Sequence, residues 1–298
     1  MALELIAPAK LNLVLEITGK RADGYHDIAS VMQTIDLADR VRLTPAPSIS
    51  LQVSGPESHS VPVDAERNLG WMAAKALAQA AGAAGMGAHI GLEKHVPAGM
   101  GLGGGSSDAA AVLRGLNRLW DLGLEPEALV EIAATVGSDV SFFVWGGAAL
   151  VTGRGERVEL IPDGMSLWLT LFVPNVELLD KTRLMYSTLS PGDFTDGMRA
   201  RTVAERIGRM LPLAVGDFYN AFDGHLSEVV TGLDAALARC RESGLQVVAA
   251  GSGPAFFSPT PRWKLPVSLL GGLERDFGVR TISCRSLSGA EAAEIREV

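Results

Sequence analysis

The stretch PAGMGLGGGSSDAAA, residues 97–111, places five glycines and two serines directly before a run of alanines. The preceding segment, residues 88–97, has the alternation of a strand, and Val112, Leu113 and Leu116 continue the alanine run at helical spacing. A strand that leads through a glycine loop into a helix aims backbone N–H groups and the positive end of the helix dipole at one point. The stretch therefore predicts a phosphate-binding loop; the alternative is a tight turn without a ligand.

Two common phosphate-binding loops do not fit these residues. A Walker A loop ends in Gly-Lys-Ser or Gly-Lys-Thr, whereas here the glycines lead into two serines without a lysine. The dinucleotide pattern G-x-G-x-x-G does occur at residues 99–104, and Asp121 follows at a suitable distance. However, the ribose-binding acid of that pattern ends a second strand, and the helix predicted over residues 109–120 leaves no room for one. A nicotinamide-dependent oxidoreductase is therefore not expected.

The composition is that of a globular protein without a nucleic-acid-binding surface. The chain has 298 residues, 47% of them hydrophobic and 20% charged, which predicts one large or two medium domains. Its formal net charge of −8 argues against the basic face that nucleic acids require. Cys240 and Cys284 have neither disulfide nor metal-ligand spacing, so we expect them to be buried in a reducing compartment. No apolar run has membrane-spanning length and the N-terminus lacks signal-peptide regions, so we expect a cytoplasmic protein with no membrane partner.

The order of predicted elements indicates an α+β protein with two domains. In the first domain, residues 1–160, the predicted elements are strands at 11–17, 30–37, 39–45, 49–53 and 88–97, helices at 65–82, 109–120 and 126–137, and a hairpin around Gly153 and Gly155. Ser138 can cap a further helix that carries Asp139 in its first turn. In the second domain, residues 161–298, the order is β-α-β-β-α-β, which predicts a split βαβ sandwich.

Four segments together resemble the GHMP kinases, the family named after galacto-, homoserine, mevalonate and phosphomevalonate kinases. The segments are VPAGMGLGGGSSDAAAVL at 96–113, APAKLNLVLEITGKRADGYH at 7–26, GSDVSFF at 137–143 and AAGSGPAFF at 249–257. The resemblance implies a two-domain GHMP-kinase-like fold with the active site in the cleft between the domains. Its N-terminal, ATP-binding domain would be like ribosomal protein S5 domain 2, and its C-terminal domain would be a ferredoxin-like sandwich.

Within the family, the segments at 7–26 and 137–143 look like the kinases that act on 4-diphosphocytidyl-2-C-methyl-D-erythritol. The implied activity is ATP-dependent phosphorylation of the 2-hydroxyl of this substrate, in the non-mevalonate synthesis of isoprenoid precursors. ATP would be the co-substrate, with Mg²⁺, and the partners would be these small molecules, with the protein a monomer or a weak homodimer. The alternative within the family is a kinase for another small alcohol, of the mevalonate or homoserine type. A nucleotide-binding protein without catalysis is a further alternative, which the presence of both Lys10 and Asp139 argues against.

The resemblance also implies roles for individual residues. Asp139 would be the general base, and Lys10 would keep it ionised and stabilise the developing alkoxide. From the residues alone, Asp139 could instead be a carboxylate that only complements a helix dipole, and Lys10 could be a surface lysine. The nucleotide-binding residues would be Pro97, Ala98, Gly99, Met100, Gly101, Leu102, Gly103, Gly104, Gly105, Ser106, Ser107, Asn68, Leu69, Lys94, Gly251, Ser252 and Gly253. The substrate-binding residues would be Asn12, Tyr25, His26, Thr182 and Tyr186, with the two tyrosines stacking on the cytosine and His26 reading its polar edge. No residue is expected to be a dedicated metal ligand, and His59, His89, His95 and His225 are expected to be structural or on the surface.

Three segments depart from the family pattern. NVELLDKT at 175–182 replaces a segment that usually carries proline, valine and a serine-threonine pair, and YNAFD at 219–223 keeps only Asn220 of a motif. GSDVS at 137–141 lacks a proline that often follows the valine. These departures affect the substrate side of the expected site more than the phosphate side.

Overall fold

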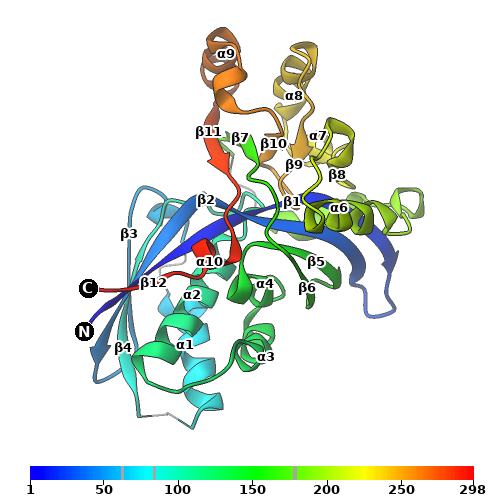
Figure 1. Cartoon of the computed structure of the whole chain (residues 1–298). Helices are drawn as coiled ribbons and strands as arrows, with labels where there is room; N and C mark the ends of the chain where they lie inside the picture. The colour runs from blue at the N-terminus through cyan, green and yellow to red at the C-terminus, as the bar shows by residue number, and fades with distance from the viewer. Residues whose placement is uncertain (62–63, 83–84, 177–179) are drawn as a thin grey trace.

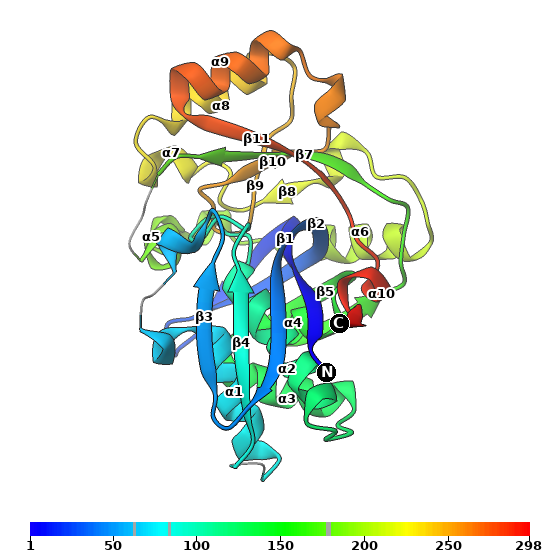
Figure 2. The same cartoon turned by 90° about the vertical axis from the view of Figure 1, so that its left-hand side faces the viewer.

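The computed structural model describes residues 1–61, 64–82, 85–176 and 180–298, which form two β-sheets with helices against them (Figures 1 and 2). The larger, eight-stranded sheet contains β1 (Leu3–Lys20), β2 (His26–Ala46), β3 (Ser50–Ser54), β4 (Gly87–Glu93), β5 (Ala148–Gly153), β6 (Arg157–Ile161), β8 (Tyr219–Asn220) and β12 (Ile295–Glu297). The four-stranded sheet contains β7 (Trp168–Pro174), β9 (Val248–Ala249), β10 (Phe256–Ser258) and β11 (Val279–Arg285).

Strands β1 and β2 form a long antiparallel ribbon that runs through the larger sheet. They pair from Leu3 opposite Leu43 to Lys20 opposite His26. The two strands predicted at 30–37 and 39–45 are therefore one strand, because Asp39 continues the ladder as a buried residue and forms no turn. The register shifts on both sides of the segment 10–12, and such irregularities locally change the direction of side chains.

Four helices cover one face of the larger sheet: α1 (Leu69–Ala80), α2 (Gly104–Leu119), α3 (Pro126–Val136) and α4 (Val140–Trp145) (Figure 2). Helix α2 begins inside the glycine-rich segment of residues 97–107, here called the glycine stretch, and five residues earlier than the sequence predicts. The reason is that Gly103 at its N-cap has φ = 73° and turns the chain directly into the helix. Both serines of the stretch therefore lie in the first turn of α2. Gly115 lets this helix approach the sheet, since a Cβ there would lie 2.4 Å from Leu43 Cδ1 and 2.9 Å from Leu5 Cδ1.

The smaller sheet confirms the predicted β-α-β-β-α-β order. Its strands lie in the order β11-β7-β10-β9, all antiparallel, which is a split βαβ arrangement. The helices of this half are α5 (Lys181–Thr188), α6 (Met198–Gly208), α7 (Leu226–Val229), α8 (Leu233–Glu242), α9 (Val267–Phe277) and α10 (Gly289–Ala292). Figure 1 shows α8 and α9 together at the end of the molecule remote from α1–α3, next to this sheet.

Strands from the second half of the sequence complete the larger sheet. The short β8 pairs in parallel with β1 at Val14 and Leu15, and β12 pairs with β1 near its start, so both chain termini lie at the same edge. A continuous apolar cluster also joins Leu11 and Leu13 of β1 to Leu171 of β7 and Phe257 of β10. The two halves are therefore packed against each other through β1. Among the described residues, no helix is long and apolar enough to cross a membrane.

The close packing of α2 gives a stability prediction. Replacing Gly115 with alanine is expected to lower the free energy of unfolding by about 1–3 kcal/mol relative to the same change at Gly271, because only the first creates an overpacked contact. Gly271 lies in α9 with nothing within 4 Å of an added Cβ, so its replacement gains helix propensity without a clash. Urea unfolding of both variants measures the difference. Equal stability of the two variants would contradict the tight contact between α2 and the sheet.

Candidate active site

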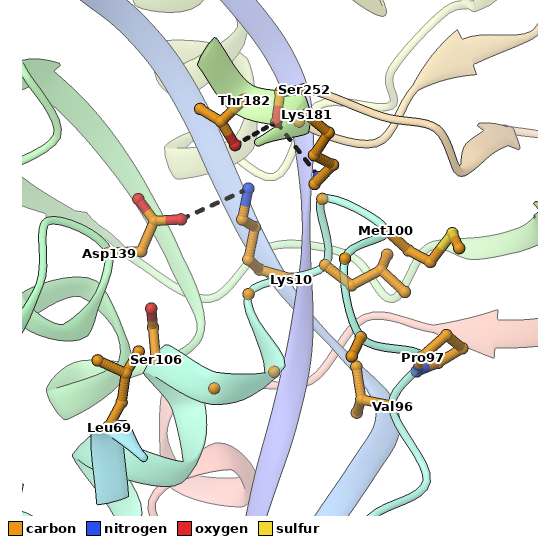
Figure 3. Close-up of a pocket in the computed structure, with 18 of the residues that line it drawn as sticks. Lys10, Leu69, Val96, Pro97, Met100, Ser106, Asp139, Lys181, Thr182 and Ser252 are labelled. Carbon is orange, nitrogen blue, oxygen red and sulfur yellow. Dashed lines mark hydrogen bonds and ion pairs between the residues drawn. The ribbon is translucent and has the colours of Figure 1, made fainter. Parts of the chain in front are cut away.

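A cavity of about 490 Å³ lies where the glycine stretch, β1, α1, α5 and the turn after β9 meet. Most residues singled out in the sequence line it, and Figure 3 shows ten of its lining residues with labels. The lining includes Lys10, Asn12, Asn68, Leu69, Lys94, every residue from Pro97 to Ser106, Asp139, Thr182, Tyr186, Gly251 and Ser252. Four of the predicted site residues, Tyr25, His26, Ser107 and Gly253, do not contribute to this lining as far as the structure is described.

Lys10 and Asn12 project into the cavity from the same face of β1, as residues two apart on a strand must. Lys10 Nζ donates to Asn12 Oδ1 at 2.6 Å, and Asn12 Nδ2 donates to the Ser30 hydroxyl at 2.7 Å. The Ser30 hydroxyl in turn donates to the Val14 carbonyl. This chain of hydrogen bonds fixes both cavity side chains against the ribbon.

Asp139 faces Lys10 across the cavity (Figure 3). Its Oδ2 lies 3.8 Å from Lys10 Nζ, with the Asp139 side chain one-third exposed and that of Lys10 almost fully buried. Burial lowers the pKa of Lys10 below its usual value, while the charge of Asp139 and a hydrogen bond to it oppose that shift. The pair thus presents one ammonium and one carboxylate to the cavity.

The position of Asp139 in its helix differs from the sequence expectation. The expected cap, Ser138, precedes the helix, and Asp139 itself is the N-cap of α4 rather than a residue of its first turn. Its side chain makes no capping hydrogen bond. The carboxylate is therefore directed to Lys10 and the cavity, and not to the helix backbone.

The glycine stretch and the turn after β9 meet through their backbones. A Cβ on Gly101, whose φ is 85°, would lie 1.9 Å from the Ala250 carbonyl oxygen. A Cβ on Gly251, whose φ is 61°, would lie 2.8 Å from the Gly101 carbonyl oxygen and 3.0 Å from Lys10 Nζ. Glycine is required at both positions because backbone atoms, which cannot move aside as side chains do, occupy the space of any side chain. Since Gly103 and Gly104 start α2 at the same place, the backbone N–H groups of a helix N-terminus border the cavity.

Asn220 does not line the cavity, but it forms hydrogen bonds to the turn after β9. This buried side chain donates to the carbonyls of Ala249 and Gly251, both at 2.8 Å, and accepts from the Phe222 N–H at 3.0 Å. Asp223 accepts from the Ala249 N–H, and burial raises the pKa of its carboxyl to about 6. Asn220 thus supports the site through the turn.

Lys94 borders the cavity, but its ammonium is committed to two carboxylates. It donates to Asp39 and to Asp108, and the side chains of all three residues are almost fully buried. Asp39 Oδ1 also accepts the backbone N–H groups of His95 and Val96, where the chain leaves β4. The three residues come from β2, the end of β4 and the first turns of α2, so they tie together the two ends of the glycine stretch.

Burial and charge set the protonation of this buried cluster. Burial alone would lower the pKa of Lys94, but the charges of Asp108 and Asp39 raise it above its usual value. Burial raises the pKa of Asp108 to about 7, against the opposing effect of Lys94 and with a further rise from Asp39. The cluster is therefore held by one ammonium that stays charged.

Tyr186 packs against two other rings at the cavity. The His26 ring centroid lies 5.1 Å from that of Tyr186, and Tyr186 is in turn 5.1 Å from Phe222. Tyr186 lines the cavity, and burial, followed by the charge of Asp139, raises the pKa of its hydroxyl to about 12. Tyr25 is 58% exposed, and the Arg154 guanidinium lies 5.1 Å from its ring centroid.

The cavity contains charged residues that the sequence interpretation did not single out. Arg67, Arg154 and Lys181 line it, as does Asp108 beside the glycine stretch. Lys181 directly precedes Thr182, so the reasoning that singled out Thr182 could also have found this lysine. Asp39 could not have been found, because its place at the start of the strand predicted over 39–45 does not show that its carboxylate is buried beside Lys94.

The structure also places the two cysteines and Ser107. Both cysteines are buried and free, and burial raises the pKa of each thiol. Among the residues that the structure describes, no group of three or more His, Cys, Asp or Glu side chains could hold a metal ion. Ser107, in the first turn of α2, is buried, and its hydroxyl has no hydrogen-bond partner within the described part of the chain.

Comparison with known proteins assigns this architecture to a class. The family profile "GHMP kinases N terminal domain" matches residues 68–147, which contain α1, β4, the glycine stretch and Asp139. A crystal structure of homoserine kinase from Cytophaga hutchinsonii superposes with a TM-score of 0.70 over 96% of this chain and 95% of that one. Its identity of 18% supports the fold alone.

Relatives with higher sequence identity point to one family within the GHMP kinases. A 4-diphosphocytidyl-2-C-methyl-D-erythritol kinase of Bacillus cytotoxicus is 40% identical over 265 residues, covering 86% of this chain and 88% of the relative. One of Exiguobacterium sibiricum is 39% identical over 286 residues, covering 92% and 94%. A crystal structure of 4-(cytidine 5'-diphospho)-2C-methyl-D-erythritol kinase has a TM-score of 0.75 and 32% identity, covering 95% of this chain and 98% of that one. The chain belongs to the GHMP kinases and, within them, to the 4-diphosphocytidyl-2-C-methyl-D-erythritol kinase family.

The buried cluster gives a prediction that separates a structural lysine from a nucleotide contact. Replacing Lys94 with methionine is expected to lower the free energy of unfolding by about 3–5 kcal/mol, because two buried carboxylates lose their shared cation. Urea unfolding without nucleotide measures this. Arg118→Met, which removes an exposed ion pair with Glu297, is the matched control and should change stability little. A Lys94→Met protein that is as stable as wild type and only binds ATP weakly would contradict the structural role.

Proposed function

We propose that this protein transfers the γ-phosphoryl group of ATP to the 2-hydroxyl of 4-diphosphocytidyl-2-C-methyl-D-erythritol, giving the 2-phosphate and ADP. The observation that carries the proposal is the Lys10–Asp139 pair, which faces the same cavity as the glycine stretch and the turn at 251–253. The relatives that bear this activity in their names match over most of the chain. The domains proposed for the reaction are residues 1–160, for ATP, and residues 161–298.

Asp139 is the proposed general base and Lys10 its partner. Phosphoryl transfer requires a hydroxyl that is oriented and relieved of its proton as it attacks. The Asp139 carboxylate can accept that proton, while the Lys10 ammonium favours its ionised form and stabilises negative charge on the attacking oxygen. Asn12, which holds Lys10, is the proposed hydrogen-bond partner for the substrate hydroxyls.

The glycine stretch is the proposed site of the ATP phosphates. The N-terminus of α2 borders the cavity beside the turn at 251–253, so a polyphosphate there would contact backbone N–H groups. Asn68 and Leu69 at the start of α1 are the proposed neighbours of the nucleoside. Asn68 is the N-cap of α1 and accepts the Gly70 N–H at 2.9 Å, so its amide nitrogen can serve the ligand.

The oxygen atoms available at the cavity suit a Mg²⁺ ion that is bound mainly by nucleotide phosphates. Such ions keep several waters and take one or two protein oxygens, which agrees with the lack of a metal cluster among the described side chains. Ser106 lines the cavity, and the buried Ser107 hydroxyl has no hydrogen-bond partner among the described residues, so these are the residues that would hold the ion. When bound, Mg²⁺ neutralises charge on the transferred phosphoryl group. The protein is further proposed to act in the cytoplasm as a monomer or weak homodimer.

The general-base role is tested by ADP release with Mg-ATP and 4-diphosphocytidyl-2-C-methyl-D-erythritol. Asp139→Asn is expected to lower kcat by a factor of roughly 10² or more, because the amide cannot accept the proton. Asp276→Asn, an exposed carboxylate on α9, is the matched control and should leave kcat unchanged. Turnover with mevalonate or homoserine in place of this substrate would overturn the proposed substrate and leave the kinase class standing.

The ring residues provide a test of base recognition. Tyr25→Ala is expected to raise KM for the diphosphocytidyl substrate by roughly 5- to 150-fold, the equivalent of one stacked base, with KM for ATP unchanged. His26→Ala should act in the same direction, because its ring packs on Tyr186, which lines the cavity. Steady-state kinetics with each substrate varied in turn separates the two effects. Unchanged kinetics in both variants would argue for a substrate without a base.

A further inference from the structure

We propose that Lys181 is a second phosphoryl-binding cation of this site, whose ammonium contacts the phosphoryl group as it passes from ATP to the substrate hydroxyl. The inference rests on the proposed kinase reaction. It adds a residue of the segment 175–182, in which the sequence departs from the GHMP kinase pattern.

Lys181 lies where α5 and the turn after β9 border the cavity. It is the first residue of α5 and lines the cavity together with Thr182, Gly251 and Ser252. Its ammonium donates to the Gly253 carbonyl and lies 3.4 Å from the Ser252 hydroxyl, which is itself 3.3 Å from the Thr182 hydroxyl. Lys181 is therefore anchored to the turn that packs against the glycine stretch, which is the proposed position of the terminal phosphates.

The charges around Lys181 favour an anion in this part of the cavity. Figure 3 shows Lys10 and Lys181 entering the cavity from different elements, β1 and α5, with Asp139 beside Lys10. Two ammonium groups against one carboxylate leave a net positive charge here, although the protein as a whole has a formal charge of −8. An ammonium has three donors, and the two protein partners of Lys181 leave one for a phosphoryl oxygen.

The protonation of Lys181 is sensitive to what occupies the cavity. Burial, and then the charge of Lys10, lower the pKa of Lys181 to about 7, against an opposing effect of Asp139. The other charged or titratable side chains that line the cavity are Arg67, Lys94, Asp108, Arg154 and Tyr186. A phosphate group next to Lys181 raises its pKa, so a bound polyanion secures the charge that binds it. Without a ligand, the ammonium is protonated below pH 7 and becomes neutral as the pH rises through that value.

Three substitutions at Lys181 separate its charge from its hydrogen bonds. Lys181→Met removes both, and we expect kcat to fall by roughly 10², as when one preorganised donor to a transition state is lost. Lys181→Arg keeps the charge and should retain kcat within roughly tenfold of wild type, whereas Lys181→Gln keeps a donor without charge and should resemble Lys181→Met. Lys264→Met, an exposed lysine of the second half, is the matched control for loss of a charge. Equal rescue by glutamine and arginine would overturn the proposal in favour of a purely structural contact to Gly253.

The pH dependence of kcat/KM provides a second readout, which a structural role would not change. This parameter reports ionisations of the free enzyme. We expect wild-type kcat/KM to fall as the pH rises through about 7, since the unliganded ammonium then loses its proton. The fall should be absent in Lys181→Arg, whose guanidinium stays charged. Superimposable profiles for wild type and Lys181→Arg would overturn the proposal.

The same assay distinguishes failure of this inference from failure of the proposed function. If wild type phosphorylates the diphosphocytidyl substrate and Lys181→Met does so within about threefold of wild type, the role of Lys181 is refuted and the reaction stands. If wild type shows no ADP release with this substrate, the proposed function fails first, and the inference that rests on it fails with it.

Discussion

The glycine stretch depends on one buried cation, the ammonium of Lys94 between Asp39 and Asp108. Each partner belongs to a different element, so this cluster fixes where the chain leaves β4 and where α2 begins. Charges removed from water interact strongly, and removal of one partner leaves the others without compensation. The glycines themselves have little intrinsic preference for one conformation. The ion cluster, together with the packing of α2 on the sheet, therefore supplies the order that the loop sequence lacks.

The cavity depends next on the backbone contact between Gly101 and the turn at residues 250–253. This contact joins a loop of the first half of the chain to a turn of the second, and Asn220 supports it by binding the carbonyls of Ala249 and Gly251. Lys181 reaches the same turn from α5. The proposed phosphate site is thus built by both halves, which the β1 strand and the apolar cluster around it hold together.

The distribution of charge explains how an acidic chain can receive polyanionic substrates. Its formal net charge is −8, yet Lys10, Arg67, Arg154 and Lys181 all line one cavity. Backbone N–H groups at the start of α2 add to this local positive potential without changing the net charge. Net charge argues against a nucleic-acid-binding surface but carries no information on a small anionic ligand, because binding depends on the few groups within a Debye length of the site.

The sequence by itself determined the glycine loop between a strand and a helix, the α+β class and the β-α-β-β-α-β order of the second half, because glycine spacing and hydrophobic periodicity are local properties. It also pointed to Lys10, Asn12 and Asp139, which stand in short motifs that resemble a known family. Only the tertiary structure decided that Asp39 is a buried partner of Lys94, that Asp139 is directed to Lys10 instead of capping its helix, and that Lys181 reaches the cavity. These residues acquire their roles from partners distant in the sequence, and no local pattern records which strand or turn will lie beside them.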